Sequence, residues 1–152
     1  MIKFENIVKK YGDKTVIDDF SLEIQPGELV VFIGPSGCGK TTTLRCIAGL
    51  EQPDQGEIIV NDKVVFSDKQ RINLPPEKRD LSMVFQSYAI WPHMTVFENV
   101  AYGLRFKKNL SAAEIREKTE AALELVGLKH LISRYATDLS GGQQQRVAVA
   151  RS

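Results

Sequence analysis

One stretch of this chain has the residue types and spacing of a phosphate-binding loop. From Gly34 to Thr41 the sequence reads Gly-Pro-Ser-Gly-Cys-Gly-Lys-Thr, which matches G-x-x-x-x-G-K-[ST] at every specified position. Its glycines allow positive φ angles and a close approach to oxygen atoms that a Cβ would push away. Lys40 adds a positive charge for the terminal phosphates, and a hydroxyl such as that of Thr41 can ligate Mg²⁺. We therefore predict that the loop binds a nucleoside triphosphate with Mg²⁺.

The residues on either side supply the elements that would position this loop. Residues 29–33 form an unbroken apolar run, which predicts a parallel strand buried on both faces. Residues 42–48 carry apolar side chains at helical spacing, which predicts a helix that begins at the loop. The unpaired N–H groups and the positive end of that helix would complete an anion site. The alternative is a glycine-rich connection that matches the pattern by chance, and the flanking strand and helix argue against it.

The composition is that of an ordinary globular protein. The chain has 152 residues, of which 43% are hydrophobic and 26% charged, with a net charge of +1. These values predict one domain and give no electrostatic reason to expect nucleic acid as a partner. The chain shows neither the apolar core of a signal peptide nor a run of transmembrane length, so we expect a cytoplasmic protein that meets a membrane only through partners. Cys38 and Cys46 have the wrong spacing for a metal site, and a reducing compartment argues against a disulfide.

Local patterns predict β structure first and helices later. Capping boxes at Thr95, Ser111 and Ser140 predict three helix starts. The apolar stripe of the second of these helices is interpreted as core packing. The expected strands are residues 2–5, 20–25, 57–60, 64–66 and 81–85, with 57–66 forming a hairpin around residues 61–63.

A second helix start has the composition of a second anion site. Leu139-Ser140-Gly141-Gly142-Gln143 combines a capping hydroxyl with two glycines. One nucleotide needs only one phosphate cradle, so the second is expected to serve a different molecule. The two motifs together resemble the ATP-binding cassette (ABC) ATPases, whose signature reads LSGGQ. The resemblance covers the whole chain and implies a head-to-tail dimer, in which each ATP lies between one phosphate loop and the other subunit's signature helix.

The resemblance also implies a fold. That fold is α/β, a P-loop NTPase (ABC ATPase) core with an N-terminal antiparallel β subdomain and an inserted helical subdomain. The implied parts are residues 1–86 for the β subdomain and core, 87–139 for the helical subdomain and 140–152 for the signature helix. The family continues with the Walker B strand, its Asp and a catalytic Glu, none of which is found here. The chain is therefore expected to be an N-terminal portion of an ATPase domain, truncated before the Walker B strand.

Carried over position by position, the resemblance implies roles for individual residues. Tyr11 matches the aromatic residue that stacks on adenine, the alternative being an ordinary tyrosine at a strand edge. Gln86 matches the glutamine that reaches Mg²⁺ and the attacking water, the alternative being a polar strand cap. The catalytic candidates are Lys40 and Gln86, the metal candidates are Thr41 and Gln86, and the nucleotide-binding candidates are Tyr11, Gly34, Pro35, Ser36, Gly37, Cys38, Gly39, Lys40, Thr41, Thr42, Ser140, Gly141, Gly142 and Gln143.

The segment after Gln86 is similar to that of a narrower group, the ATPases of bacterial importers for sugars, polyamines and ferric iron. In that group this region docks the coupling helices of the membrane subunits. The resemblance thus implies permease subunits near Gln86–Thr95, with Tyr88, Trp91 and Met94 as apolar anchors. The alternative is that these side chains pack the helical segment.

Together these patterns predict the ATP-binding subunit of a membrane importer, a homodimer at the cytoplasmic face of the inner membrane, which couples ATP binding and hydrolysis to solute uptake. One alternative is a soluble ABC ATPase of translation or DNA maintenance. Another, for this chain by itself, is nucleotide binding without efficient hydrolysis. Cys38 lies beside Lys40 at a helix N-terminus, so we expect a reactive thiol that bound ATP protects, the alternative being a small filler of the loop.

Overall fold

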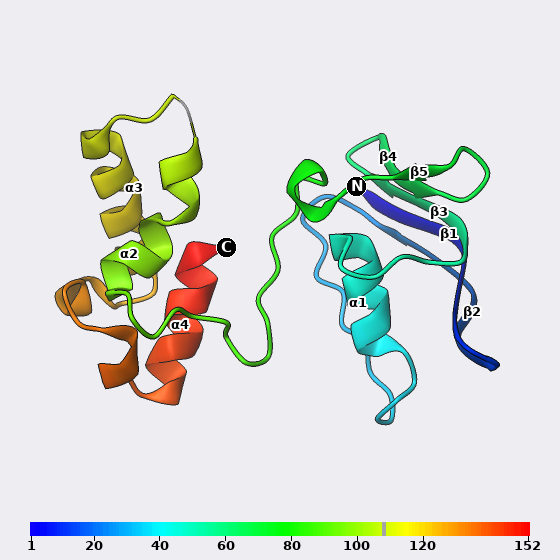
Figure 1. Cartoon of the computed structure of the whole chain (residues 1–152), viewed down its shortest axis with the longest axis horizontal. Helices are drawn as coiled ribbons and strands as arrows, with labels where there is room; N and C mark the ends of the chain where they lie inside the picture. The colour runs from blue at the N-terminus through cyan, green and yellow to red at the C-terminus, as the bar shows by residue number, and fades with distance from the viewer. Residues whose placement is uncertain (108) are drawn as a thin grey trace. The chain divides into compact units, whose positions relative to one another are not determined.

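The computed structural model describes residues 1–107 and 109–152, which divide into two compact units (Figure 1). The first is Met1–Ser82 and the second is Met83–Ser152. Each unit has its own hydrophobic core. The division into residues 1–86, 87–139 and 140–152 stays a prediction.

An antiparallel sheet forms the first unit, with five strands in the order β2-β1-β3-β4-β5. Its strands are β1 (Ile2–Tyr11), β2 (Lys14–Ile24), β3 (Gln55–Val60), β4 (Lys63–Ser67) and β5 (Ile72–Asn73). The expected antiparallel strands at the N-terminus and the expected hairpin are confirmed. Asn61 and Asp62 join β3 to β4 with φ angles of 48° and 63°, and positive values at both positions are what a two-residue hairpin turn requires.

Helix α1 (Lys40–Ala48) packs on this sheet and confirms the helix predicted after the loop. Cys46 of α1 is fully buried in a core with Phe4 and Ile7 of β1 and Ile58 of β3. Gly49 ends the helix with a φ of 78°, the left-handed conformation that glycine adopts at low cost. The sheet and the helix therefore hold the phosphate loop, which precedes α1, at one end of the unit.

Two expected strands are wrong. Residues 29–33 and 81–85 form no strand, and Leu29 and Ile33 are 89% and 92% exposed. An apolar run becomes a buried parallel strand only when neighbouring strands satisfy its backbone on both sides. Every strand pair in the sheet of this unit joins the five strands to each other, and none of them includes these two segments. The segments therefore keep their apolar character without the partners that would make them strands.

Helices form the second unit. The helices are α2 (Val96–Ala101), α3 (Ala112–Leu125) and α4 (Gly141–Arg151), and the short 3-10 turns of the chain are η1 (Pro76–Lys78, in the first unit), η2 (Gly103–Phe106), η3 (Lys129–Leu131) and η4 (Ala136–Asp138). All three predicted capping boxes are present, at Thr95, Ser111 and Ser140. Thr119 and Leu123 of α3 are fully buried, which confirms that the apolar stripe packs the core.

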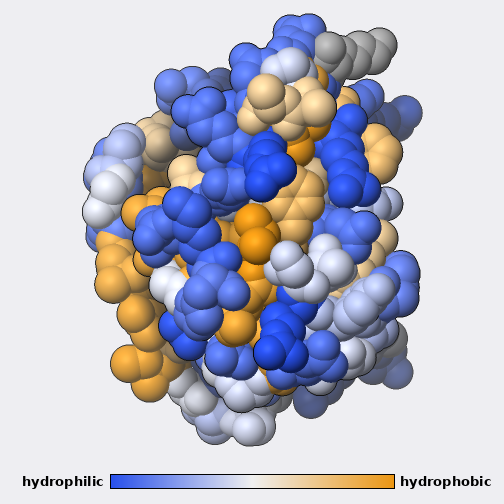
Figure 2. All heavy atoms as spheres, turned by 90° about the vertical axis from the view of Figure 1, so that its left-hand side faces the viewer, coloured by the Kyte–Doolittle hydropathy of each residue, from blue (hydrophilic) through white to orange (hydrophobic). Residues whose placement is uncertain are grey.

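One face of this unit mixes polar and apolar side chains. Figure 2 shows hydrophilic residues around exposed hydrophobic ones on the face that carries α3. Leu125 at the end of α3 is 90% exposed and Phe106 is 71% exposed. Across the part of the chain that the structure describes, none of the helices combines the length and the apolar character needed to cross a bilayer.

A buried arginine that sequence patterns did not indicate holds the carboxyl end of α1. The guanidinium of Arg79 donates to the carbonyl oxygens of Cys46 at 2.7 Å and Ile47 at 3.1 Å. It also donates to the backbone oxygen of Leu74 at 2.7 Å and to Asn73 Oδ1 at 2.8 Å. Arg79 is only 1% exposed, and this burial lowers the pKa of its guanidinium. The last carbonyls of a helix need partners and favour a cation, and Arg79 supplies both.

We expect Arg79→Met to lower the free energy of unfolding of the chain by about 3 kcal/mol, because four acceptors lose a buried, charged donor. Urea denaturation followed by circular dichroism measures the change. Lys78→Met is the control, since Lys78 is exposed, and should change stability by less than about 0.5 kcal/mol. Equal effects of the two substitutions would contradict the role given to Arg79.

Candidate functional site

The phosphate loop has a backbone that requires glycine at two positions. Gly37 and Gly39 have φ angles of 80° and 95°, both in the left-handed region. A Cβ on Gly39 would lie 2.8 Å from the backbone oxygen of Val16 in β2, so a side chain there would force the loop away from the sheet. Gly39 is also the N-cap of α1, and no side chain caps the helix. The N–H groups of its first turn are therefore left for an anion.

Lys40 brings a positive charge to this open helix end. Its Nζ donates to the backbone oxygens of Gly34 at 2.7 Å and Pro35 at 2.8 Å, and lies 3.5 Å from Cys38 Sγ. These contacts hold the ammonium group against the loop itself. Thr41, the next residue, is exposed on the first turn of α1. The loop thus combines an ammonium group, a hydroxyl and free N–H groups, which are the donors and the ligand type that a phosphate chain with its metal ion would need.

A cavity of about 410 Å³ adjoins the loop. Its lining comes from β2, from residues 31–33 and from Cys38, Lys40 and Thr43. The rings of Phe20 and Phe32, on its apolar side, lie edge to face with centroids 6.0 Å apart. Cys38 and Lys40 are therefore open to solvent from this side of the unit.

Tyr11 ends β1 close to the same helix. The residue is 47% exposed, and Lys9 Nζ lies 4.9 Å from the centroid of its ring. Burial, followed by a hydrogen bond with Glu51, raises the pKa of the Tyr11 hydroxyl, while a hydrogen bond with Thr42 acts in the opposite direction. Lys9 also pairs with Glu51, whose N–H donates to the backbone oxygen of Arg45 in α1, so the structure brings the candidate adenine-stacking residue close to the phosphate-loop helix.

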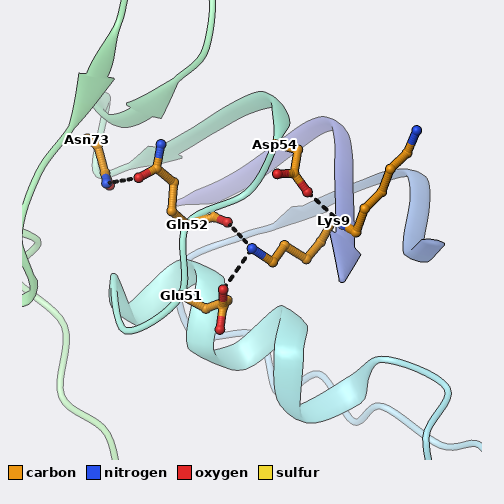
Figure 3. Close-up of polar contacts among 6 residues, drawn as sticks. Lys9, Glu51, Gln52, Asp54 and Asn73 are labelled. Carbon is orange, nitrogen blue, oxygen red and sulfur yellow. Dashed lines mark hydrogen bonds and ion pairs between the residues drawn. The ribbon is translucent and has the colours of Figure 1, made fainter. Parts of the chain in front are cut away.

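A polar network that sequence patterns did not indicate surrounds Lys9 (Figure 3). Lys9 Nζ lies 2.7 Å from Glu51 Oε1 and donates to the backbone oxygen of Gln52 at 2.8 Å. Asn73 Nδ2 donates to Gln52 Oε1 at 3.0 Å. The hydrogen bond from Lys9, and next the one from Tyr11, hold the pKa of Glu51 below its usual range. A local motif search could not have found this network, because its members come from separate parts of the chain.

The signature residues form the amino end of α4 in the second unit. Ser140 Oγ accepts from the Gln143 N–H at 3.4 Å, and the Ser140 N–H donates to Gln143 Oε1 at 2.9 Å. Gly141 and Gly142 are exposed, and a Cβ on either would meet no atom within 4 Å. This helix end is therefore capped and at the same time bare on its outer side, which leaves room for a second molecule.

The segment that follows Gln86 is tied to the other end of α4. Arg151 donates to the backbone oxygens of Ala89 at 2.8 Å and Tyr88 at 3.1 Å. Its guanidinium carbon lies 4.6 Å from the centroid of the Trp91 ring. Trp91 in turn contacts Tyr102, with ring centroids 4.4 Å apart, which favours packing within the unit as one role of this residue. Gln86 is exposed.

The candidate residues divide between the two units. Tyr11 and residues 34–42 belong to the first, where the structure places them around the amino end of α1, and Gln86, Ser140, Gly141, Gly142 and Gln143 belong to the second. Their roles, and any meeting of the two sets, stay predictions.

Residues 17–152 match the model of the family described as ABC transporter. A solved dimeric bacterial ABC transporter cassette is similar to the chain, with 34% identity and a TM-score of 0.83 over 99% of this chain and 68% of that one. A post-hydrolysis state of the ATP-binding cassette, bound to ADP and Pi, is 33% identical, with a TM-score of 0.82 over the same shares of both chains.

Curated relatives match nearly the whole chain. The Fe(3+) ions import ATP-binding protein FbpC of Brucella suis is 56% identical over 99% of this chain and 41% of the relative. The spermidine/putrescine import ATP-binding protein PotA of Aggregatibacter actinomycetemcomitans is 50% identical, over 100% and 39%. The trehalose/maltose import ATP-binding protein MalK of Thermococcus litoralis is 46% identical, over 99% and 40%. The chain therefore spans less than half the length of these relatives.

The two cysteines should react differently. Cys38 is exposed in the loop, whereas Cys46 is fully buried and burial raises the pKa of its thiol to about 11. We expect iodoacetamide at about pH 8 to alkylate Cys38 and to spare Cys46, and MgATP to slow the reaction at Cys38. Peptide mass spectrometry reads both sites, with the chain unfolded in urea as the control in which both react. Labelling of Cys46 in the folded chain would contradict these expectations, and so would a rate of Cys38 labelling that is the same with and without MgATP.

Proposed function

Because this chain belongs to the ABC transporter family, we propose that it is the ATP-binding part of an import ATPase. The observation that carries the proposal is the amino end of α1, where Gly39 leaves the helix without a side-chain cap and Lys40 lies against the loop. The names of the relatives support the same function, since each is an import ATP-binding protein. Ferric iron, sugars and polyamines are the corresponding candidate solutes.

The loop would hold the phosphates of ATP. The free N–H groups of the first turn of α1 and the ammonium group of Lys40 would donate to the β- and γ-phosphate oxygens. Thr41 and Gln86 would hold Mg²⁺, which supplies charge neutralisation along the phosphate chain, and a hydroxyl and an amide oxygen are suitable ligands for so hard a cation. Tyr11 would stack on the adenine ring.

The amino end of α4 would complete the site of a second copy of the protein. The bare glycines beside Ser140 fit an approach by the phosphates bound to the other subunit. The dimeric state named for the similar cassette supports this arrangement. Closure on two ATP molecules would move permease subunits docked near Gln86–Thr95, at the cytoplasmic face of the membrane. Hydrolysis, with Lys40 and Gln86 as catalytic residues, is assigned to the whole protein.

Lys40→Ala tests the phosphate site. We expect the dissociation constant for MgATP to rise roughly tenfold or more, because a charge-assisted hydrogen bond to phosphate is lost. Isothermal titration calorimetry measures it. Lys69→Ala removes an exposed lysine from a turn of the same unit and should leave the constant unchanged. An unchanged affinity in Lys40→Ala would place ATP elsewhere on the protein.

Gly141→Asp tests the second anion site. A Cβ at this position meets no atom within 4 Å and an aspartate suits the positive end of α4, so the fold should persist. We expect ATP-dependent dimerisation of the whole protein to be lost, since the new carboxylate repels the phosphates of the other subunit, while ATP binding to the monomer remains. Light scattering after size-exclusion chromatography reports the dimer. Gln145→Asp, at an exposed position farther along α4, is the matched control, and loss of the dimer in both variants would count against the proposal.

A further inference from the structure

The loop that follows α1 is fastened to strand β1 on both sides of Lys9. At its start, the N–H groups of Leu50 and Glu51 donate to the backbone oxygen of Arg45 in α1, at 2.9 and 3.2 Å. At its end, the Asp54 N–H donates to the backbone oxygen of Val8 at 2.8 Å, and Asp54 Oδ2 accepts from the Lys10 N–H at 2.6 Å. The loop therefore joins the carboxyl end of α1 to the last residues of β1, which Figure 3 shows side by side.

Lys9 and Glu51 form a shielded ion pair inside this junction. Their side chains are 10% and 24% exposed, and the two charged atoms lie 2.7 Å apart. The second hydrogen bond of Lys9, to the backbone oxygen of Gln52, fixes the ammonium group in one place. A pair with so little contact with solvent is weakly screened and holds its two side chains in a definite geometry, unlike an exposed surface pair.

The same ammonium group lies against the ring of Tyr11. Residues 9 and 11 are two apart in a strand, so their side chains leave the sheet on the same side. Lys9 Nζ is 4.9 Å from the ring centroid, within the range of a cation–π contact. Burial raises the pKa of the Tyr11 hydroxyl, and the neighbouring Glu51 carboxylate, as an acceptor, acts in the same direction. The ion pair thus contacts the face of the ring through the ammonium group of Lys9.

We propose that Lys9 and Glu51 are positioning residues that hold the Tyr11 ring for a nucleotide base. The inference rests on the proposed function, because the base is that of the nucleotide bound at the phosphate loop. The ion pair fixes the ring relative to α1, with part of the ring exposed to receive the base. It therefore contributes to the affinity for a nucleoside triphosphate and contributes nothing to the affinity for inorganic triphosphate, which carries no base.

The test compares the dissociation constants of MgATP and of magnesium tripolyphosphate, measured by calorimetry with the whole protein. In Lys9→Met we expect the dissociation constant for MgATP to rise about fivefold, because the substitution removes the contribution that a positioned, stacked ring makes to the affinity. The dissociation constant for tripolyphosphate should stay unchanged. Glu51→Gln keeps the shape of the side chain and should show the same selective loss. Lys3→Met breaks the exposed Lys3–Glu5 pair on the same strand and should change neither constant.

A double-substitution cycle separates positioning from general damage. In a Tyr11→Ala background, Lys9→Met should have no further effect on MgATP binding, because the ring that it positions is gone. Equal weakening of both ligands, a loss that persists without Tyr11, or no loss in either single variant would each overturn the inference. If Lys40→Ala leaves the dissociation constant for tripolyphosphate unchanged, the proposed function is overturned instead. Failure of the inference and failure of the proposed function are therefore distinguishable.

Discussion

The guanidinium of Arg79 donates to the last carbonyl groups of α1, and this contact makes the two ends of the helix chemically different. A helix leaves carbonyl groups unpaired at one end and N–H groups at the other. In this chain a buried cation satisfies the carbonyl end, while Gly39 leaves the amino end without a side-chain cap. The helix is thus anchored where it meets the core and open where the phosphate loop begins. A phosphate group suits that open end in both charge and hydrogen bonding.

The rest of the first unit keeps this helix and its loop in place. The buried face of the sheet packs on Cys46, and the backbone of Val16 in β2 comes so close to Gly39 that only glycine fits. The loop after α1 returns to β1 through Asp54 and through the Lys9–Glu51 pair. Strand β1, which carries Tyr11, is therefore joined to the carboxyl end of α1 through this loop. A site built in this way is held by strands and a helix, which position side chains more precisely than a free loop does.

In the second unit, the amino end of the signature helix is capped by side chains, unlike the amino end of α1. Ser140 and Gln143 cap α4 reciprocally, yet the two glycines that follow leave the outer side of the helix end bare. The carboxyl end of the same helix contacts the segment after Gln86 through Arg151. Helix α4 thus carries the signature motif at its amino end and contacts the segment after Gln86 at its carboxyl end. Membership of the ABC transporter family agrees with both motifs occurring in one chain.

The sequence alone determined the features that depend on neighbours along the chain. The phosphate loop, the three capping boxes and the hairpin turn at Asn61 and Asp62 each need only a few adjacent residues, so their patterns could be read directly. The candidate site residues came from such local motifs and from the family resemblance that these motifs support.

Only the tertiary structure decided what depends on distant partners. Residues 29–33 have the apolar character of a strand and form none, because a strand exists through hydrogen bonds to other strands. Arg79 and the Lys9–Glu51 pair carry no motif, since ordinary surface arginine, lysine and glutamate residues look the same in a sequence. Their roles arise when folding brings β1, the end of α1 and the loops around them together. Burial there strengthens each hydrogen bond and ion pair.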